Sequence, residues 1–282
     1  MEPLINKLHQ KGVLILDFGS QYTQLIARRV RELNVYSEIL PPETKLDHIK
    51  EIAPSAIILS GGPSSVFADE APSFDKKIFD IEVPILGICY GLQLLAHHHD
   101  GLVESNGQGE YGFAEIEIDD NKKLFQNVSK TSQVWMSHMD RVTKIPDGWH
   151  ALAHSSNGVI AAMSNKDQSI VATQFHPEVA HTEEGKIFLN NFLFKIANCS
   201  PTWTAGNFIE EQIKLIRNQV KEDKVIVGVS GGVDSTVVAA LLHKAIGDQS
   251  TAILIDHGML RLNEAKNCVK ALKDGLGVNI HC

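Results

Sequence analysis

Cysteine is scarce in this sequence, and its four cysteines form no C-x-x-C pair and no zinc-binding spacing. Isolated cysteines argue against a disulfide framework and favour a reducing compartment. The sequence also lacks a signal peptide and any apolar run of membrane-spanning length. We therefore expect a soluble, cytoplasmic protein with no membrane partner. The cysteines stand alone at Cys89, Cys199, Cys268 and Cys282.

Blocks of basic residues are absent as well. Lys and Arg number 26 against 34 Asp and Glu, and the net charge of -8 argues against a nucleic-acid partner held through its phosphates. The run from His97 to His99 ends a predicted helix, and consecutive residues of a helix point in different directions. We therefore expect no metal site there and no tightly bound cofactor.

Apolar strands alternate with amphipathic helices in the first part of the chain. Strands are predicted at 12–18, 56–60 and 84–88, with a helix at 21–33. This order is typical of an α/β fold whose sites lie at the carboxyl ends of parallel strands. From residue 112 onward short β runs follow one another, so we expect a mixed, mostly parallel central sheet.

A second α/β unit follows a break in this pattern. The segment 199–207 is rich in turn-forming residues and is predicted to link a domain at 1–198 to another at 208–282. After the linker, a strand, a helix at 235–246 and a second strand predict the start of a Rossmann-like parallel sheet.

The sequence Gly87-Ile88-Cys89-Tyr90-Gly91 leaves an apolar strand and enters a helix. A helix N-terminus favours thiolate, which is the reactive form of cysteine, and offers free N–H groups to an oxyanion. Serine hydrolases place their nucleophile on the same kind of turn. A buried structural cysteine is the alternative interpretation of this motif alone.

Far downstream, His176-Pro177-Glu178 follows another predicted strand. His176 can act as the base for Cys89, and Glu178 can orient the imidazole as the carboxylate does in a Ser-His-Asp triad. The alternative for His176 is an ordinary loop histidine. The two motifs together predict nucleophilic catalysis by a thiol.

A glycine-rich loop, 230–235, lies between an apolar strand and an apolar helix. Its backbone N–H groups and serine hydroxyls, together with the helix dipole, can bind a phosphate. It has no G-K-[ST] and is not a Walker A loop. A simple Gly-Gly turn between strand and helix is the alternative.

Residues 12–197 resemble a class I, triad-type glutamine amidotransferase domain, and residues 16–22 (LDFGSQY) resemble the GMP synthase family in particular. The resemblance implies a catalytic triad of Cys89, His176 and Glu178. It also implies that Gly61 and Tyr90 supply the N–H groups of an oxyanion hole.

The resemblance extends to the part that recognises glutamine. It implies that Gln93 contributes to this site, that Asp140 pairs with the α-ammonium group, and that Ser137 and His138 touch the carboxylate. Met139 stands where the family usually has glycine, so its side chain could crowd the substrate.

The loop at 230–235 resembles the pyrophosphate loop of the N-type ATP pyrophosphatases. The resemblance implies that ATP, with Mg²⁺, adenylylates xanthosine monophosphate (XMP), and that ammonia made at Cys89 displaces AMP to give GMP. The ATP-binding residues would be Ser230, Gly231, Gly232, Val233, Asp234 and Ser235.

Members of this family continue well past residue 282. We therefore expect the chain to be a fragment that ends within the ATP pyrophosphatase domain, is limited to the glutaminase half, and lacks the C-terminal domain through which relatives form homodimers. Two other interpretations stay open: a non-catalytic remnant and a stand-alone glutaminase subunit. The intact thiol motifs argue against the remnant, and the phosphate loop argues against the stand-alone glutaminase.

Overall fold

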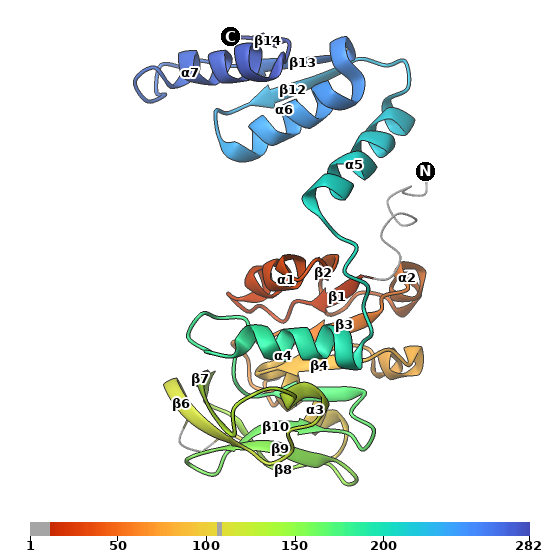
Figure 1. The fold of residues 1–282 in the computed structure, drawn as a ribbon, viewed down its shortest axis with the longest axis vertical. Helices are drawn as coiled ribbons and strands as arrows, with labels where there is room; N and C mark the ends of the chain where they lie inside the picture. Colours follow the sequence, from red (N-terminus) through yellow and green to blue (C-terminus); the bar gives the residue numbers. More distant parts are fainter. Residues whose placement is uncertain (1–11, 106–108) are drawn as a thin grey trace. The chain divides into compact units, whose positions relative to one another are not determined.

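A computed structural model describes residues 12–105 and 109–282 (Figure 1). Contacts between Cα atoms divide this part of the chain into two compact units, with the boundary between Trp203 and Thr204. The first unit contains a nine-stranded sheet in the order β2-β1-β3-β4-β11-β10-β9-β6-β7. The second contains a three-stranded sheet in the order β12-β13-β14.

Five neighbouring strands of the first sheet run parallel, and nearly all residues of these strands are buried except in the edge strand β2, which is mostly half-buried. Such short apolar runs are typical of strands that are covered on both faces. These strands are β1 (Val13–Leu16), β2 (Ser37–Leu40), β3 (Ala56–Leu59), β4 (Ile85–Ile88) and β11 (Ile170–Thr173). The helices of this half are α1 (Thr23–Glu32), α2 (Leu46–Ile52) and α3 (Tyr90–His98).

The other half of the sheet is antiparallel and leaves one face partly exposed. In β6 (Glu110–Ile118), Ile116 and Ile118 are buried whereas Tyr111 and Phe113 are exposed, which is the period of two expected of a half-buried strand. The remaining strands are β7 (Thr131–His138), β9 (His150–Ser155) and β10 (Ile160–Ser164), and β5 (Leu102–Glu104) pairs separately with β8 (Arg141–Lys144). The predicted α/β fold with a mixed central sheet is confirmed.

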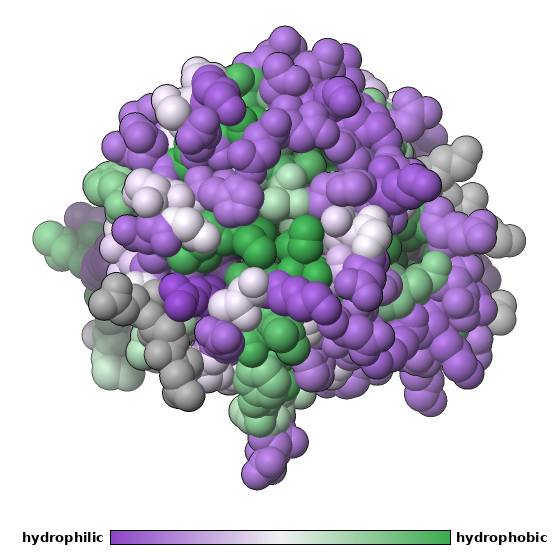
Figure 2. Space-filling model, turned by 90° about the horizontal axis from the view of Figure 1, so that it is seen from below, coloured by the Kyte–Doolittle hydropathy of each residue, from purple (hydrophilic) through white to green (hydrophobic). Residues whose placement is uncertain are grey.

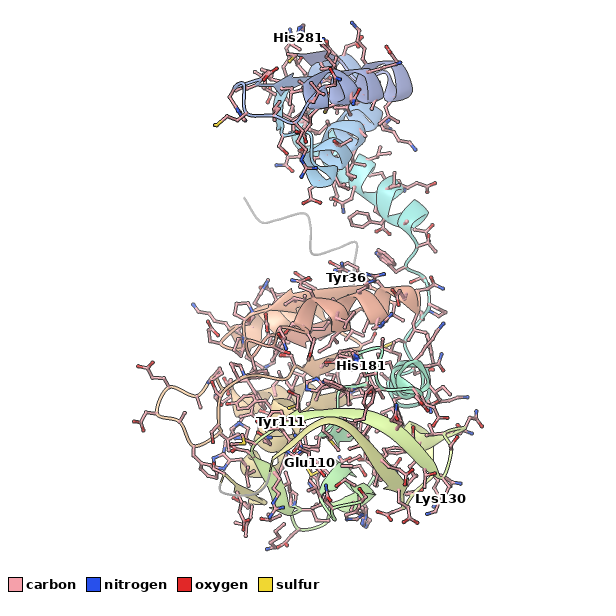
Figure 3. The ribbon with its side chains drawn as sticks, turned by 90° about the vertical axis from the view of Figure 1, so that its left-hand side faces the viewer. Tyr36, Glu110, Tyr111, Lys130, His181 and His281 are labelled. Carbon is pink, nitrogen blue, oxygen red and sulfur yellow. The ribbon has the colours of Figure 1, made fainter. Side chains whose placement is uncertain are left out.

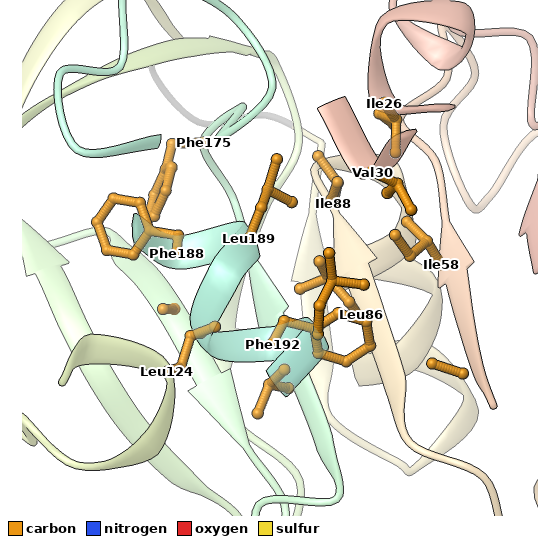
Figure 4. Packing of buried hydrophobic residues seen from close by; sticks show 14 of the residues in the cluster. Ile26, Val30, Ile58, Leu86, Ile88, Leu124, Phe175, Phe188, Leu189 and Phe192 are labelled. Carbon is orange, nitrogen blue, oxygen red and sulfur yellow. The ribbon is translucent and has the colours of Figure 1, made fainter. Parts of the chain in front are cut away.

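Two hydrophobic clusters cover the two faces of this sheet. On one face α1 and α4 (Gly185–Asn191) pack against the parallel strands, and Ile26, Leu189 and Phe192 meet Ile58 and Leu86 there (Figure 4). The helix α3 packs on the other face. The molecular surface seen in Figure 2 is mostly hydrophilic, with hydrophobic residues gathered near its centre.

The second unit is a short α/β layer whose three strands are all parallel, as predicted. Its elements are α5 (Ala205–Val220), β12 (Val225–Val229), α6 (Val233–Ile246), β13 (Ser250–Leu254), α7 (Glu264–Lys270) and β14 (Ile280–His281). Apolar side chains of α6 and α7 join those of the strands in one cluster. No helix in the described part of the chain has both the length and the apolarity needed to cross a membrane.

Two helices begin within segments that the sequence assigns to a linker or to a loop. Helix α5 starts at Ala205, within the expected linker at 199–207, because the Thr204 hydroxyl accepts a hydrogen bond from Asn207 N at 3.1 Å and caps the helix there. Helix α6 starts at Val233 instead of Ser235. The last residues of the glycine-rich loop therefore form the first turn of α6.

Candidate active site

Cys89 lies on the turn between β4 and α3 with φ of 52° and ψ of -101°. This conformation is strained for a residue with a side chain and is typical of a nucleophile held at the top of a sheet. The Cys89 N–H donates to Thr173 O at 2.7 Å, so the end of β11 holds the turn in place. Helix α3 begins with the next residue, Tyr90.

Gly87 and Gly91, which flank the turn, allow α3 to pack closely on the strands. A Cβ atom on Gly91 would lie 2.5 Å from Leu59 O, and one on Gly87 would lie 2.7 Å from the backbone of Gly91. In the structure the close contacts that require these glycines are contacts with the protein's own backbone.

His176 and Glu178 form a buried pair, with His176 Nδ1 2.7 Å from Glu178 Oε1. Backbone contacts fix both residues: His176 N donates to Trp135 O at 3.0 Å, and Arg29 Nε donates to Glu178 O at 3.0 Å. Because the carboxylate accepts from Nδ1, the opposite nitrogen, Nε2, is left to face the thiol. Thr182 Oγ1 adds a hydrogen bond of 2.6 Å to His176 O.

The electrostatic surroundings of His176 stabilise its protonated form. Burial by itself lowers the pKa of this histidine, but the charge of Glu178, the hydrogen bond with Cys89 and the hydrogen bond with Glu178 outweigh burial. Together these influences raise the pKa of His176 to about 10. At neutral pH His176 therefore favours its imidazolium form beside the Cys89 sulfur.

Two further groups contact the Cys89 sulfur. Ser137 O lies 3.6 Å from Sγ, and Gln174 Nε2 lies 3.7 Å from it. Gly61 is close to both reactive side chains, since a Cβ atom there would lie 3.2 Å from His176 Cε1 and 3.6 Å from Cys89 Cβ. The N–H of Tyr90, at the first position of α3, has no partner within the helix by geometry.

A cavity of about 590 Å³ opens beside these residues. Cys89 and His176 line it, and Glu178 lies behind His176. Four residues expected to bind glutamine line the same cavity, namely Gln93, Ser137, His138 and Asp140. The structure thus brings together two sets of residues that are far apart in the sequence.

Among the four residues expected to bind glutamine, Asp140 contributes the acidic side chain. Its side chain is buried, and Oδ2 has no hydrogen-bond partner within the described part of the chain. Its backbone carbonyl accepts from Gln93 Nε2 at 2.8 Å and contacts His138 Nδ1 at 3.0 Å. A buried, unpaired carboxylate beside a cavity is suited to a cationic group such as an ammonium.

The His138 ring is held by protein atoms on both sides, since Nε2 lies 3.3 Å from Glu110 Oε2 and Nδ1 faces Asp140 O. Its backbone is therefore the part left to touch a substrate carboxylate, and the role expected of His138 stays a prediction. Met139 lines the cavity and is 57% exposed, so its side chain can turn away from a bound substrate.

Glu110 belongs to none of the sequence motifs, although the pattern of β6 marks it as an inward-facing residue. Side chains of a strand alternate between its two faces, and Glu110 lies an even number of residues before the buried Ile116 and Ile118. Its carboxylate is therefore expected on the same inward face. It is 8% exposed and faces His138 on the neighbouring strand. An inward charge on a half-buried strand requires partners, and these partners lie at the candidate site.

Hydrogen bonds within the glycine-rich loop of the second unit hold its two ends together. Gly231 has φ of 84°, in the left-handed region that favours glycine. Ser230 Oγ and Ser235 Oγ lie 3.1 Å apart, and Gly232 N donates to Ser230 Oγ at 3.3 Å. The loop therefore presents two hydroxyls and the start of α6 in one place, as a phosphate site requires.

Comparison with protein families divides the chain in the same way. Residues 14–196 match the family "Glutamine amidotransferase class-I", and residues 207–281 match the family "NAD synthase". The chain is 51% identical to GMP synthase [glutamine-hydrolyzing] of Brachyspira hyodysenteriae over 95% of its length and 49% identical to that of Wolinella succinogenes over 96%. It spans about half the length of these relatives, 52% and 53%.

Solved structures agree with the first of these families. A protein from Thermoplasma acidophilum, named as one of the subunits of a GMP synthase, matches 72% of this chain and 98% of its own, with 30% identity and a TM-score of 0.61. A glutamine amidotransferase from Thermotoga maritima, at 23% identity and a TM-score of 0.51, shares the fold. With the family model covering most of the chain, the protein belongs to the class-I glutamine amidotransferase family.

Proposed function

We propose that the first unit hydrolyses glutamine to glutamate and ammonia. The observation that carries this proposal is the buried His176–Glu178 pair beside a strained Cys89, with Cys89 and His176 lining one cavity. The Cys89 thiolate attacks the side-chain amide carbon, and the N–H groups of Gly61 and Tyr90 stabilise the resulting oxyanion.

The remaining steps move one proton at a time through His176. The imidazolium gives its proton to the leaving nitrogen, so that ammonia departs and a thioester to Cys89 remains. The imidazole then takes a proton from water, whose oxygen attacks the thioester carbon. The products are glutamate and the free thiol, and Glu178 holds the ring throughout.

We further propose that the ammonia is used to make GMP from XMP that ATP has activated, in the cytoplasm. The names of the relatives and the loop at 230–235, in a unit spanning 208–282, support this proposal. Among the described residues no three acidic, histidine or cysteine side chains cluster as a metal site. Mg²⁺ would therefore come with ATP, and Asp234, exposed in the first turn of α6, is placed to contact it.

Replacing Asp140 with asparagine tests the glutamine site. We expect the KM for glutamine to rise about tenfold or more, because the substitution removes a charge-assisted contact with the α-ammonium. Alkylation of Cys89 by a small neutral reagent should be unchanged. Asp147→Asn, at a side chain that is 98% exposed, is the matched control. An unchanged KM in Asp140→Asn would assign the ammonium to another group.

Replacing Gly232 tests the phosphate loop. Asp and Asn both cap helices well, so Gly232→Asp and Gly232→Asn should leave α6 equally stable. Only the aspartate adds a negative charge where the phosphates would bind, and we expect it to weaken Mg-ATP binding about tenfold relative to asparagine. Calorimetric titration measures this. Equal affinity in both variants and the unaltered protein would place ATP elsewhere.

A further inference from the structure

Glu110 and His138 face each other across the β6–β7 hairpin, where they are paired in register. Figure 3 shows Glu110 at one end of this hairpin and Lys130 at the other. Both side chains of the pair are buried, and the carboxylate is held on three sides. Its Oε1 accepts from Ser155 Oγ at 2.8 Å and from Asn157 Nδ2 at 2.8 Å, and its Oε2 lies 3.3 Å from His138 Nε2.

The chemistry of these contacts fixes the number of protons. Asp140 O is a carbonyl and can only accept, so His138 Nδ1 must carry a hydrogen in order to bond to it at 3.0 Å. The remaining contact, between His138 Nε2 and Glu110 Oε2, then requires one further proton. Without that proton a nitrogen lone pair would face a carboxylate in a buried place, which is unfavourable.

The contacts run from Glu110 to the glutamine site. His138 Nδ1 and Gln93 Nε2 both bond to the carbonyl of Asp140, and the carboxylate of this same residue lies unpaired beside the cavity. If His138 turns, the carbonyl loses one of its two donors. The direction in which the Asp140 carboxylate points therefore depends on the Glu110–His138 pair.

We propose that Glu110 is a positioning residue for glutamine: through one proton shared with His138, it holds the turn 137–140 in the form that binds substrate. This inference rests on the proposed glutaminase function. It assigns a role to a residue that does not touch the substrate, and it makes glutamine binding depend on a proton that the chemical steps do not use.

Several titratable groups surround this pair. Burial lowers the pKa of His138 and outweighs the hydrogen bonds to Glu110 and to the carbonyl of Asp140, which raise it, and His176 adds to the lowering. The groups that act on His138 are Glu110 from β6, Asp140 from the turn after β7 and His176 from the loop after β11. Asp140 in turn acts on Tyr90 of α3. The side chains contributed by β9 and the turn after it, Ser155 and Asn157, are neutral.

The test compares three variants by the pH dependence of KM and kcat for glutamine hydrolysis. In Glu110→Gln the amide oxygen can keep both Oε1 contacts, and the amide N–H can donate permanently to His138 Nε2. We expect its KM to stay constant as the pH rises through the lowered pKa of His138, whereas the KM of the unaltered protein should rise over that range as the shared proton is lost. Glu110→Ala should raise KM about tenfold at all pH values and change kcat less. Glu115→Gln, at an exposed position of the same strand, is the control.

The outcomes separate the two proposals. If the unaltered protein hydrolyses no glutamine, the proposed function is wrong. If it does, and the KM of Glu110→Gln rises over the same pH range as that of the unaltered protein, the shared proton is not what holds the turn. Because Cys89 and His176 are the same in both proteins, their titration cannot produce the difference. Thermal unfolding and alkylation mapped to Cys89 show whether each variant is folded, and the isosteric Gln variant decides should the Ala variant unfold.

Discussion

Replacing Cys89 with serine is expected to lower glutamine hydrolysis by about 10³-fold or more, the loss typical when a triad nucleophile is removed. The side chain sits on a strained turn fixed by Thr173 and by the packing of Gly87 and Gly91, so a hydroxyl would occupy the same place. The loss would therefore reflect the weaker nucleophile. Release of glutamate or ammonia measures it, with thermal unfolding as the check on the fold.

Cys199→Ser is the matched control for this substitution. Cys199 is also buried, but burial raises the pKa of its thiol to about 11, so it stays protonated and unreactive at neutral pH. Burial likewise raises the pKa of Cys268. A glutamine analogue that carries an electrophile should label Cys89 alone. Labelling of Cys199 or Cys268, or full activity in Cys89→Ser, would contradict the assigned nucleophile.

The sequence predicts the reactive elements well because local patterns determine them. The apolar run of β4, the glycines around Cys89 and the start of α3 are all contiguous, so a strand, a tight turn and a helix follow from their order. The position of His176 after β11 is likewise local. That β11 lies beside β4, with Thr173 next to Ile88, depends on the pairing of strands far apart in the chain.

The groups around Asp140 could not be predicted in the same way. A period of two shows that Glu110 and His138 point inward, but only the β6–β7 register makes them partners. The resemblance assigns His138 to the substrate site, but only the folded structure shows that protein atoms contact both nitrogens of its ring. The start of α5 depends on one capping hydroxyl, that of Thr204. The surrounding residues have the composition of a linker, so the sequence did not predict a helix start there.

Replacing His176 with asparagine is expected to lower glutamine hydrolysis about 10³-fold, because the variant lacks both the base and the acid of the proposed steps. Alkylation of Cys89 should also slow, since the thiolate loses its imidazolium partner. His181→Asn is the control: this histidine lies in the same loop, labelled in Figure 3, and its ring centroid lies 4.4 Å from that of Trp135. We expect the His181→Asn variant to hydrolyse glutamine within about twofold of the rate of the unaltered protein.

Glu178→Gln should reduce glutamine hydrolysis less than His176→Asn does. It should also shift the pH dependence of the reaction in a direction that follows from the contacts of His176. Among the influences that raise the pKa of His176, the charge of Glu178 is the largest, so removing it lowers a pKa that now stands at about 10. The imidazolium that protonates the departing nitrogen is then lost at lower pH, and the alkaline limb of kcat/KM moves in that direction. A pH profile with an unmoved alkaline limb would show that Glu178 orients the ring without setting its charge.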